Sequence, residues 1–236
     1  MRKHFFLFSV LSFFVISILA QEPQVNDSIV KANLVSYYHS SFQEQQGLYN
    51  GIEHSGYSPV IKGHAYYLTR DWQKGTVWYD GIFYKDVSLL YDIYKDQVVI
   101  RHSNEIYIIG LVSSKVSAFT ISGLRFKRLS IAAENIQAGF YELLFEGKLT
   151  VLAKRSKKLR EYINVKMEYE FLDQDQLIIE KDGTYNIIRK ESNLIDVLGD
   201  QRALVKQYLR KNKIRFRDNP QQAIILAVEY YESLKR

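Results

Sequence analysis

The sequence contains no cysteine, and only 3 prolines and 12 glycines among its 236 residues. The absence of cysteine excludes disulfide scaffolds, thiol catalysis, iron–sulfur clusters, cysteine-ligated zinc and a lipid anchor on an amino-terminal cysteine. With 47% hydrophobic and 25% charged residues, the composition also excludes a disordered or collagen-like chain. We therefore expect a globular fold whose stability depends on its apolar core alone.

Motifs typical of catalytic and nucleotide sites are also absent. The chain has no G-x-S-x-G elbow, no H-E-x-x-H motif, no phosphate-binding glycine loop and no dinucleotide fingerprint. Sites that the fold assembles from distant residues leave no such trace, so a hydrolase that uses Asp or Glu with His stays an alternative. That alternative requires two members of one set to meet in a cleft: Asp80, Asp92, Glu142, His54 and His64.

The amino terminus has the layout of a secretory signal peptide. Arg2 and Lys3 precede an uncharged apolar run over residues 5–19, and the small residue Ala20 follows it. An uncleaved membrane anchor is disfavoured, because a spanning helix needs about 20 apolar residues. We predict residues 1–20 as the signal peptide, cleavage after Ala20, and a periplasmic, outer-membrane-associated or secreted location. Cleavage removes two cations, which lowers the formal charge from +6 to +4.

The rest of the chain divides into three parts. Residues 21–47 are polar and predict an arm or a short helix, and residues 48–190 predict a β-rich body. Turn dipeptides separate short runs of Tyr, Phe, Ile, Val and Thr within that body. These dipeptides are Asn50-Gly51, Asp80-Gly81, Ser122-Gly123 and Asp182-Gly183.

Two runs in this body alternate between apolar and other residues, as half-buried strands do. No helical pattern lies between the strands, which favours an antiparallel meander, either a sandwich or an open barrel. The runs place Val87, Leu89, Tyr91 and Ile93 on one strand face, and Val165, Met167, Tyr169 and Phe171 on another.

Residues 191–236 have helical spacing, so the predicted fold class is α+β, with carboxyl-terminal helices packed on the sheet. Ser192 is a candidate cap for a first helix, and Asn219 followed by Pro220 is typical of the start of another. The apolar positions of the first helix fall on one face: Leu194, Ile195 and Leu198.

Aromatic residues are the most unusual feature of the composition, with 18 Tyr, 13 Phe and 2 Trp. Many of them gather in the first strands. Side chains alternate between the faces of a strand, so an aromatic surface that stacks on sugars or binds partner chains is a natural hypothesis. The candidate ligand-binding residues are Tyr66, Tyr67, Trp72, Trp78, Tyr79 and Tyr84.

Metal and cofactor sites are not indicated. His54 and His64 fit no ligand spacing, and Asp80, Asp86 and Asp92, like Asp96, have the positions of turn residues rather than calcium ligands. We expect no metal and no cofactor.

Basic residues form two clusters, one over residues 154–160 and one over residues 206–217. Solvated turns and helix ends are the simpler interpretation. The functional alternative is binding to anionic lipid or polysaccharide, which an exported protein meets more readily than nucleic acid.

The strand region resembles uncharacterised exported proteins of Bacteroidota. The resemblance implies a shared β-rich exported fold and brings no activity and no catalytic residues. It rests on segments within residues 48–152: Tyr49-Asn50-Gly51, Gly63-His64-Ala65-Tyr66-Tyr67, Gly75-Thr76-Val77-Trp78-Tyr79-Asp80-Gly81, Leu90-Tyr91-Asp92 and Gly139-Phe140-Tyr141-Glu142.

The leading functional hypothesis is a non-enzymatic binding or scaffold component of the cell envelope, with an envelope protein or a glycan as its partner. A lipocalin-like carrier, with an apolar ligand inside a closed barrel, is a second hypothesis. The hydrolase is the third. The sequence leaves the oligomeric state open.

Overall fold

The structure is a computed structural model that describes residues 47–102, 104–130, 136–163 and 167–235. The predicted signal peptide and, apart from Gly47, the predicted arm lie outside these residues. No helix in the described ranges is long and apolar enough to cross a membrane.

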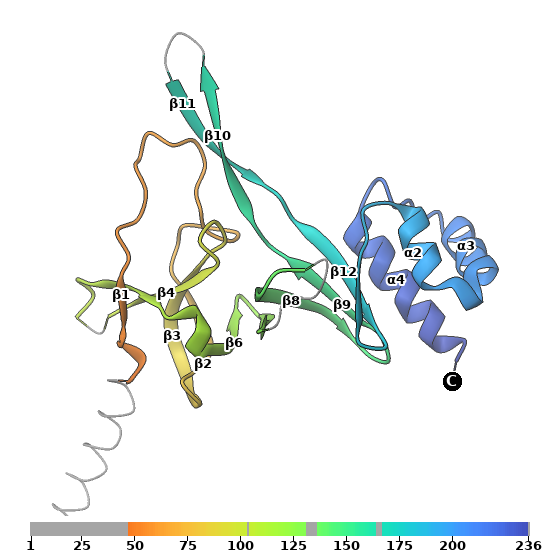
Figure 1. The fold of residues 1–236 in the computed structure, drawn as a ribbon, viewed down its shortest axis with the longest axis horizontal. Coiled ribbons are helices and arrows are strands. Elements are labelled where there is room, and N and C mark those ends of the chain that lie inside the picture. The colour runs from red at the N-terminus through yellow and green to blue at the C-terminus, as the bar shows by residue number, and fades with distance from the viewer. Residues whose placement is uncertain (1–46, 103, 131–135, 164–166, 236) are drawn as a thin grey trace, which may run out of the picture. The chain divides into compact units, whose positions relative to one another are not determined.

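Among the described residues, eleven strands form one antiparallel sheet in the order β1-β5-β4-β3-β2-β6-β7-β8-β9-β12-β13 (Figure 1). The sheet is not closed, and β1 and β13 are its edges. With the carboxyl-terminal helices, this architecture confirms the predicted fold class. The strands are β1 (Gly51–Glu53), β2 (Gln73–Tyr79), β3 (Ile82–Asp92), β4 (Gln97–Arg101), β5 (Ile108–Leu111), β6 (Val116–Ile121), β7 (Leu124–Leu129), β8 (Gly139–Glu146), β9 (Thr150–Lys154), β12 (Gln176–Lys181) and β13 (Thr184–Ile187).

Three of the predicted turns join neighbouring strands: Asp80-Gly81, Ser122-Gly123 and Asp182-Gly183. In each, both residues have positive φ, the backbone that two-residue hairpin turns require. The hairpin predicted at Asn50-Gly51 is wrong, because Gly51 begins β1 and pairs with Leu111 of β5. A turn dipeptide reports a local backbone preference, whereas the partner of β1 lies far along the chain.

The larger core lies against one face of β2 to β8. The four residues predicted to share one strand face are all buried in it: Val87, Leu89 and Tyr91 of β3, and Ile93 directly after this strand. Aromatic rings fill much of this core: Phe119 and Phe126 stack with centroids 4.7 Å apart, and Tyr91 packs edge-on against both.

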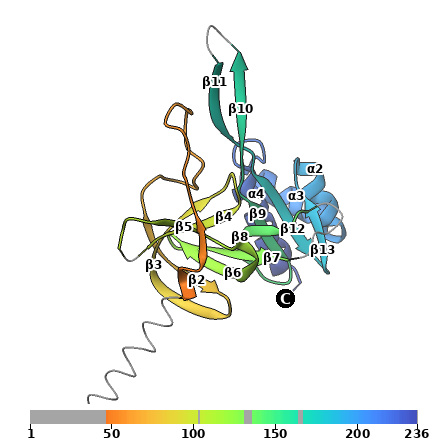
Figure 2. The ribbon, with the colours of Figure 1, turned by 60° about the vertical axis from the view of Figure 1, so that its left-hand side comes forward.

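A separate two-stranded sheet consists of β10 (Lys157–Ile163) and β11 (Met167–Asp173), which extend as a hairpin between β9 and β12 (Figure 2). The half-buried face predicted for this segment is only partly correct. Phe171 at the base is buried, but Met167 near the tip is 58% exposed. Tyr169 lies between these extremes, and Val165 lies outside the described residues. A two-stranded ribbon buries only what another element covers, and the elements that contact this one lie at its base.

The helices are α2 (Glu191–Val197), α3 (Arg202–Lys211) and α4 (Pro220–Ser233), with a 3-10 turn over Gly199–Gln201. As predicted, Leu194, Ile195 and Leu198 are buried together. They share a core with Val151 of β9 and Ile179 of β12, so the helices pack on this part of the sheet.

Of the two predicted helix caps, one is present. The Asn219 side chain accepts a hydrogen bond of 2.9 Å from the Gln222 N–H and caps α4 as predicted. The cap predicted at Ser192 is wrong, because α2 begins at Glu191 after an extended Lys190.

Candidate functional site

Residues 54–72 connect β1 to β2, and we call them the linking segment. It is tied to the end of β3, where the Tyr67 N–H donates to the Tyr91 carbonyl and the Ile93 N–H donates to the Ala65 carbonyl. It is also tied to the hairpin, because the Lys62 N–H donates to the Tyr169 carbonyl and the Lys62 carbonyl accepts from the Phe171 N–H. The segment therefore bridges the large sheet and the base of the hairpin.

A buried polar cluster lies beneath the linking segment. His54 Nε2 lies 3.4 Å from Asp92 Oδ2, and the two side chains are 1% and 0% exposed. The Tyr57 hydroxyl donates to the same Asp92 oxygen at 2.6 Å, and the Tyr66 hydroxyl lies 3.4 Å from His54 Nε2. Two tyrosines from the linking segment are thus anchored by their hydroxyl groups on one histidine–aspartate pair.

The remaining bonds of Asp92 hold the turn after β3. Its Oδ1 accepts from the N–H groups of Tyr94 and Lys95, at 3.0 and 2.9 Å. Burial lowers the pKa of His54, while Asp92 opposes this shift and Lys95 adds to it. Burial and the bond to Asp92 raise the pKa of Tyr57. At neutral pH, His54 is therefore a neutral imidazole and Tyr57 a neutral donor.

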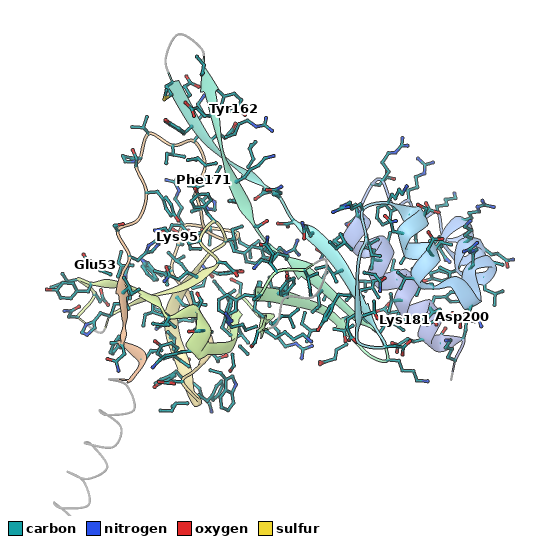
Figure 3. All side chains as sticks on the ribbon, viewed as in Figure 1. Glu53, Lys95, Tyr162, Phe171, Lys181 and Asp200 are labelled. Carbon is teal, nitrogen blue, oxygen red and sulfur yellow. The ribbon has the colours of Figure 1, made fainter. Side chains whose placement is uncertain are left out.

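An open cavity of about 290 Å³ lies beside this cluster. Its walls are the rings of Tyr57, Tyr66 and Phe171, and His64 and Arg70 also line it. The Tyr57 ring meets Phe171 edge-on at 5.2 Å and Tyr66 edge-on at 6.4 Å. Phe171 is labelled in Figure 3, at the base of the hairpin and on the side of the linking segment. We call this cavity the aromatic cleft. Its lining is completed by five small residues or proline and one isoleucine: Gly56, Ser58, Pro59, Gly63, Ala65 and Ile61.

A second hollow, of about 430 Å³, shares His64 with the aromatic cleft. Unlike the aromatic cleft, this hollow has a largely charged lining, which includes Arg155, Lys157, Asp173 and Asp175. Burial, Lys157 and Arg70 lower the pKa of His64. Within the described residues, the buried His64 Nδ1 has no hydrogen-bond partner. His64 is therefore a neutral ring that joins two cavities of different polarity.

Arg155 forms the polar floor of the second hollow. Its Nε donates to Glu142 of β8 at 2.6 Å, its Nη1 to Asp175 at 2.6 Å and its Nη2 to Gln221 of α4 at 2.7 Å. The Tyr67 hydroxyl donates to the same Glu142 oxygen at 3.0 Å. One guanidinium thus joins the sheet, the base of the hairpin and the helices.

The six predicted ligand-binding residues do not form one surface. Tyr67, Tyr79 and Tyr84 are buried in the core, because they occupy inward positions of the linking segment, β2 and β3. Treating Tyr79 as a surface aromatic is wrong: it is 1% exposed, and its hydroxyl donates to the Asn50 carbonyl. Trp72 packs against the Arg101 guanidinium.

Three of the predicted residues reach a surface or a cavity: Tyr66, Trp78 and Tyr67, which lines the second hollow from the core side. Tyr66 lines the aromatic cleft. Trp78 is 45% exposed and packs against Phe83 of the neighbouring strand, with ring centroids 4.8 Å apart. This outer aromatic pair, Trp78 with Phe83, lies on the face of the sheet opposite the core, since the next residues, Val77 and Tyr79, point inward.

The geometry required for the hydrolase alternative is met by one pair only. His54 and Asp92 meet, but Glu142 is held by Arg155, and Asp80 pairs with Lys115 at an exposed turn. The His54–Asp92 pair is covered, and its side-chain neighbours are tyrosine hydroxyls that it positions. Across the described residues, no three His, Cys, Asp or Glu side chains are grouped as metal ligands.

Sequence reasoning missed Tyr57, Arg70 and Phe171 as members of the site. Phe171 carried a signal, because it ends an alternating strand, but that pattern predicted a core face rather than a cavity wall. Tyr57 and Arg70 lie in an irregular segment where no period distinguishes a lining residue from any other.

Comparisons with protein-family models, with curated proteins and with solved structures found no match. The resemblance to exported proteins of Bacteroidota therefore stays a prediction. Any function must be argued from the site itself.

Proposed function

We propose that this chain is an exported, non-enzymatic binding protein of the cell envelope that holds one sugar ring of a glycan in the aromatic cleft. The observation that carries this proposal is the double anchoring of the cleft wall. The rings of Tyr57 and Tyr66 line the cavity, while Asp92 and His54 hold their hydroxyl groups from behind. A wall that is fixed before the ligand arrives loses little conformational entropy on binding.

The volume favours a small group. Pockets for drug-sized ligands occupy roughly 300 to 1,000 Å³, and the aromatic cleft, at about 290 Å³, lies just below that range. A single pyranose ring or an aromatic side chain has the appropriate size. The cleft is open on the outside, so the rest of a longer ligand can extend from it.

The polarity favours a sugar over an apolar group. Aromatic faces pack against the C–H faces of a pyranose, and hydroxyl groups need donors and acceptors at the rim. The cleft supplies the rings, together with the exposed Arg70. The second hollow, which shares His64 with the cleft, adds the carboxylates of Asp173 and Asp175 for a second sugar unit.

Two alternatives have less support. A lipocalin-like carrier needs a closed barrel around an empty interior, but this sheet is open, and side chains such as Phe119, Phe126 and Phe140 fill its core. A hydrolase needs an accessible acid–base pair, but both members of the His54–Asp92 pair are covered by the residues that they position.

The outer aromatic pair is a second candidate surface for the same class of partner. Trp78 and Phe83 are exposed side by side, and the hydroxyl groups of Thr76 and Thr120 lie 2.9 Å apart on the same face. A flat surface of this kind suits a polysaccharide chain rather than a single ring.

Saturation-transfer NMR with a panel of hexoses, N-acetylhexosamines and hexuronates, as monomers and dimers, tests the proposal. We expect transfer to at least one sugar, and at least a tenfold weaker affinity in Arg70→Ala and Tyr66→Phe. Both changes leave the core intact, because Arg70 is exposed and Tyr66→Phe removes only one hydroxyl group.

The matched control is Trp78→Ala, which removes an exposed aromatic outside the cleft. If only this variant loses binding, the outer aromatic pair is the glycan surface and the cleft assignment is wrong. If no sugar of the panel binds the wild-type protein, the proposed function is wrong.

A further inference from the structure

Positive charge in this protein is concentrated in one stretch. Residues 202–217 contain seven Arg and Lys residues and no Asp or Glu. Because the whole chain carries +6, the remainder of the chain carries a formal charge of −1. The stretch comprises α3 and the loop that follows it, and its basic residues are Arg202, Lys206, Arg210, Lys211, Lys213, Arg215 and Arg217.

All seven of these side chains are exposed. Arg202, Lys206 and Arg210 follow one another at four-residue intervals, which places them along one stripe of α3. Val205 and Leu209, on a neighbouring side of α3, are fixed in the core. The helix is therefore held with its cationic side toward solvent.

Few of these charges are neutralised by the protein. Among the described residues, Arg202 alone of the seven has a carboxylate within 4 Å, in an exposed contact of 3.4 Å with Asp196. Two other carboxylates near the helices are engaged elsewhere, since Asp200 binds Lys235 and Tyr231 and Glu232 accepts from the Leu149 N–H.

We propose that this surface, which we call the α3 basic face, docks the protein on an anionic lipid bilayer. The contact is with headgroups rather than the acyl region, because the apolar side of α3 is already buried in the core. Leu204, two turns before Lys211 on the same side of α3, is 41% exposed, and it adds an apolar contact that a purely ionic partner does not use. The α3 basic face lies on a different element from the aromatic cleft, so this proposal is independent of the proposed function.

Cosedimentation with vesicles tests the docking surface. The full chain is mixed with phosphatidylcholine vesicles, with and without 30% phosphatidylglycerol, at about 0.05 and 0.5 M salt, because screening weakens headgroup attraction. We expect stronger binding to the anionic vesicles that decreases at high salt. The variant Lys206→Gln/Arg210→Gln/Lys211→Gln should bind them roughly a hundredfold more weakly, at about fivefold for each cation removed.

The matched control is Lys74→Gln/Lys148→Gln/Lys158→Gln, which removes the same charge from exposed sites elsewhere. Glutamine is compatible with a helix, so α3 should form in the test variant, and circular dichroism checks this. Unchanged binding of the α3 variant, or an equal loss in the control, overturns the proposal. Binding to soluble heparin without a preference for anionic vesicles also overturns it, because the partner is then a polyanion in solution.

Discussion

The hydroxyl group of Tyr57 lies 2.6 Å from Oδ2 of the fully buried Asp92, and that same oxygen lies 3.4 Å from His54 Nε2. A carboxylate and an imidazole at this separation are often read as a catalytic pair. Here both are covered, and the groups around them are the hydroxyls of two tyrosines whose rings form the wall of a cavity. The relationship therefore supports a structural role for the pair, in which buried polar groups fix the position of apolar surface.

His54 makes the stability of the protein depend on pH. Its folded pKa is lowered from the usual value of 6.5, so below that pH the unfolded chain takes up a proton more readily than the folded chain. The free energy of unfolding should be at its highest above about pH 7.5. It should fall as the pH decreases from there, by at most about 1.4 kcal/mol per pH unit for this histidine. Urea denaturation at intervals between pH 7.5 and 5.5 measures this decrease in the free energy of unfolding.

The variant His54→Gln removes this titration without adding a charge. We expect it to be less stable at pH 7.5 and to show a shallower decline toward pH 5.5. His64, whose pKa is also lowered, accounts for part of the remaining slope. An unchanged slope in His54→Gln would show that the buried imidazole does not resist protonation.

The variant Asp92→Ala tests how much the buried polar cluster contributes to stability, by removing the carboxylate that pairs with His54. It removes the acceptor of the Tyr57 hydroxyl and of the N–H groups of Tyr94 and Lys95. Each buried donor that loses its partner costs about 1 to 3 kcal/mol, and some regain water, so we expect a total loss of about 3 kcal/mol. Nitrogen-15 NMR should show the largest shifts in residues 54–67. Asp218→Ala, at an exposed aspartate outside the cluster, should cost less than about 1 kcal/mol.

The Arg155–Glu142 contact should be the most costly ion pair to break. Arg155→Met leaves the buried Glu142 carboxylate with the Tyr67 hydroxyl as its remaining bond, and removing one partner of such a pair costs about 3 to 5 kcal/mol. The loss is measured by urea denaturation. Arg125→Met is the matched control, because Arg125 and Glu146 are both exposed and such pairs contribute at most about 1 kcal/mol.

The double variant Arg155→Met/Glu142→Gln separates an unpaired charge from lost packing. We expect it to be more stable than Arg155→Met alone, because no uncompensated carboxylate remains buried. Equal losses in the single and double variants would mean that packing of the Arg155 side chain against Tyr67, at 5.7 Å, dominates the effect.

Much of the fold could be predicted from local patterns. Asp80-Gly81 and Asp182-Gly183 specify their turns through positive φ, and the alternation from Val87 to Ile93 specifies a buried strand face. These features depend on neighbours in sequence. The pairing of β1 with β5 and the exposure of Met167 depend on which distant element covers each strand, and no local period contains that information.

The candidate site depends even more on distant elements than the fold does. Trp78 and Tyr79 are adjacent aromatics with similar composition around them, yet one is exposed and the other is in the core. Alternation predicts that they differ but does not say which one faces inward. The aromatic cleft depends on Tyr57, Tyr66 and Phe171, which come together because Lys62 pairs with Tyr169 and Phe171 across the fold.

Gly139 is the residue at which a single methyl group should disturb the polar contacts around Asp96. A Cβ at this position would lie 2.2 Å from Asp96 Oδ2 and 2.6 Å from Lys154 Nζ, and the φ of +150° is unfavourable for other residues. Asp96 and Lys154 form a contact of 2.7 Å, and Asp96 also accepts from the buried Tyr91 hydroxyl at 2.6 Å. Gly139→Ala must therefore displace a partly buried ion pair as well as adopt a strained backbone.

We expect Gly139→Ala to lower the free energy of unfolding by about 3 kcal/mol or more, as the sum of backbone strain and a broken pair. Gly123→Ala is the matched control. Gly123 has a φ of +78° with no atom within 4 Å of its added Cβ, so it should show only the backbone cost of about 1 to 2 kcal/mol. If the two variants lose equal stability in urea, the added methyl group does not displace Asp96 and Lys154, and the cost at Gly139 is conformational alone.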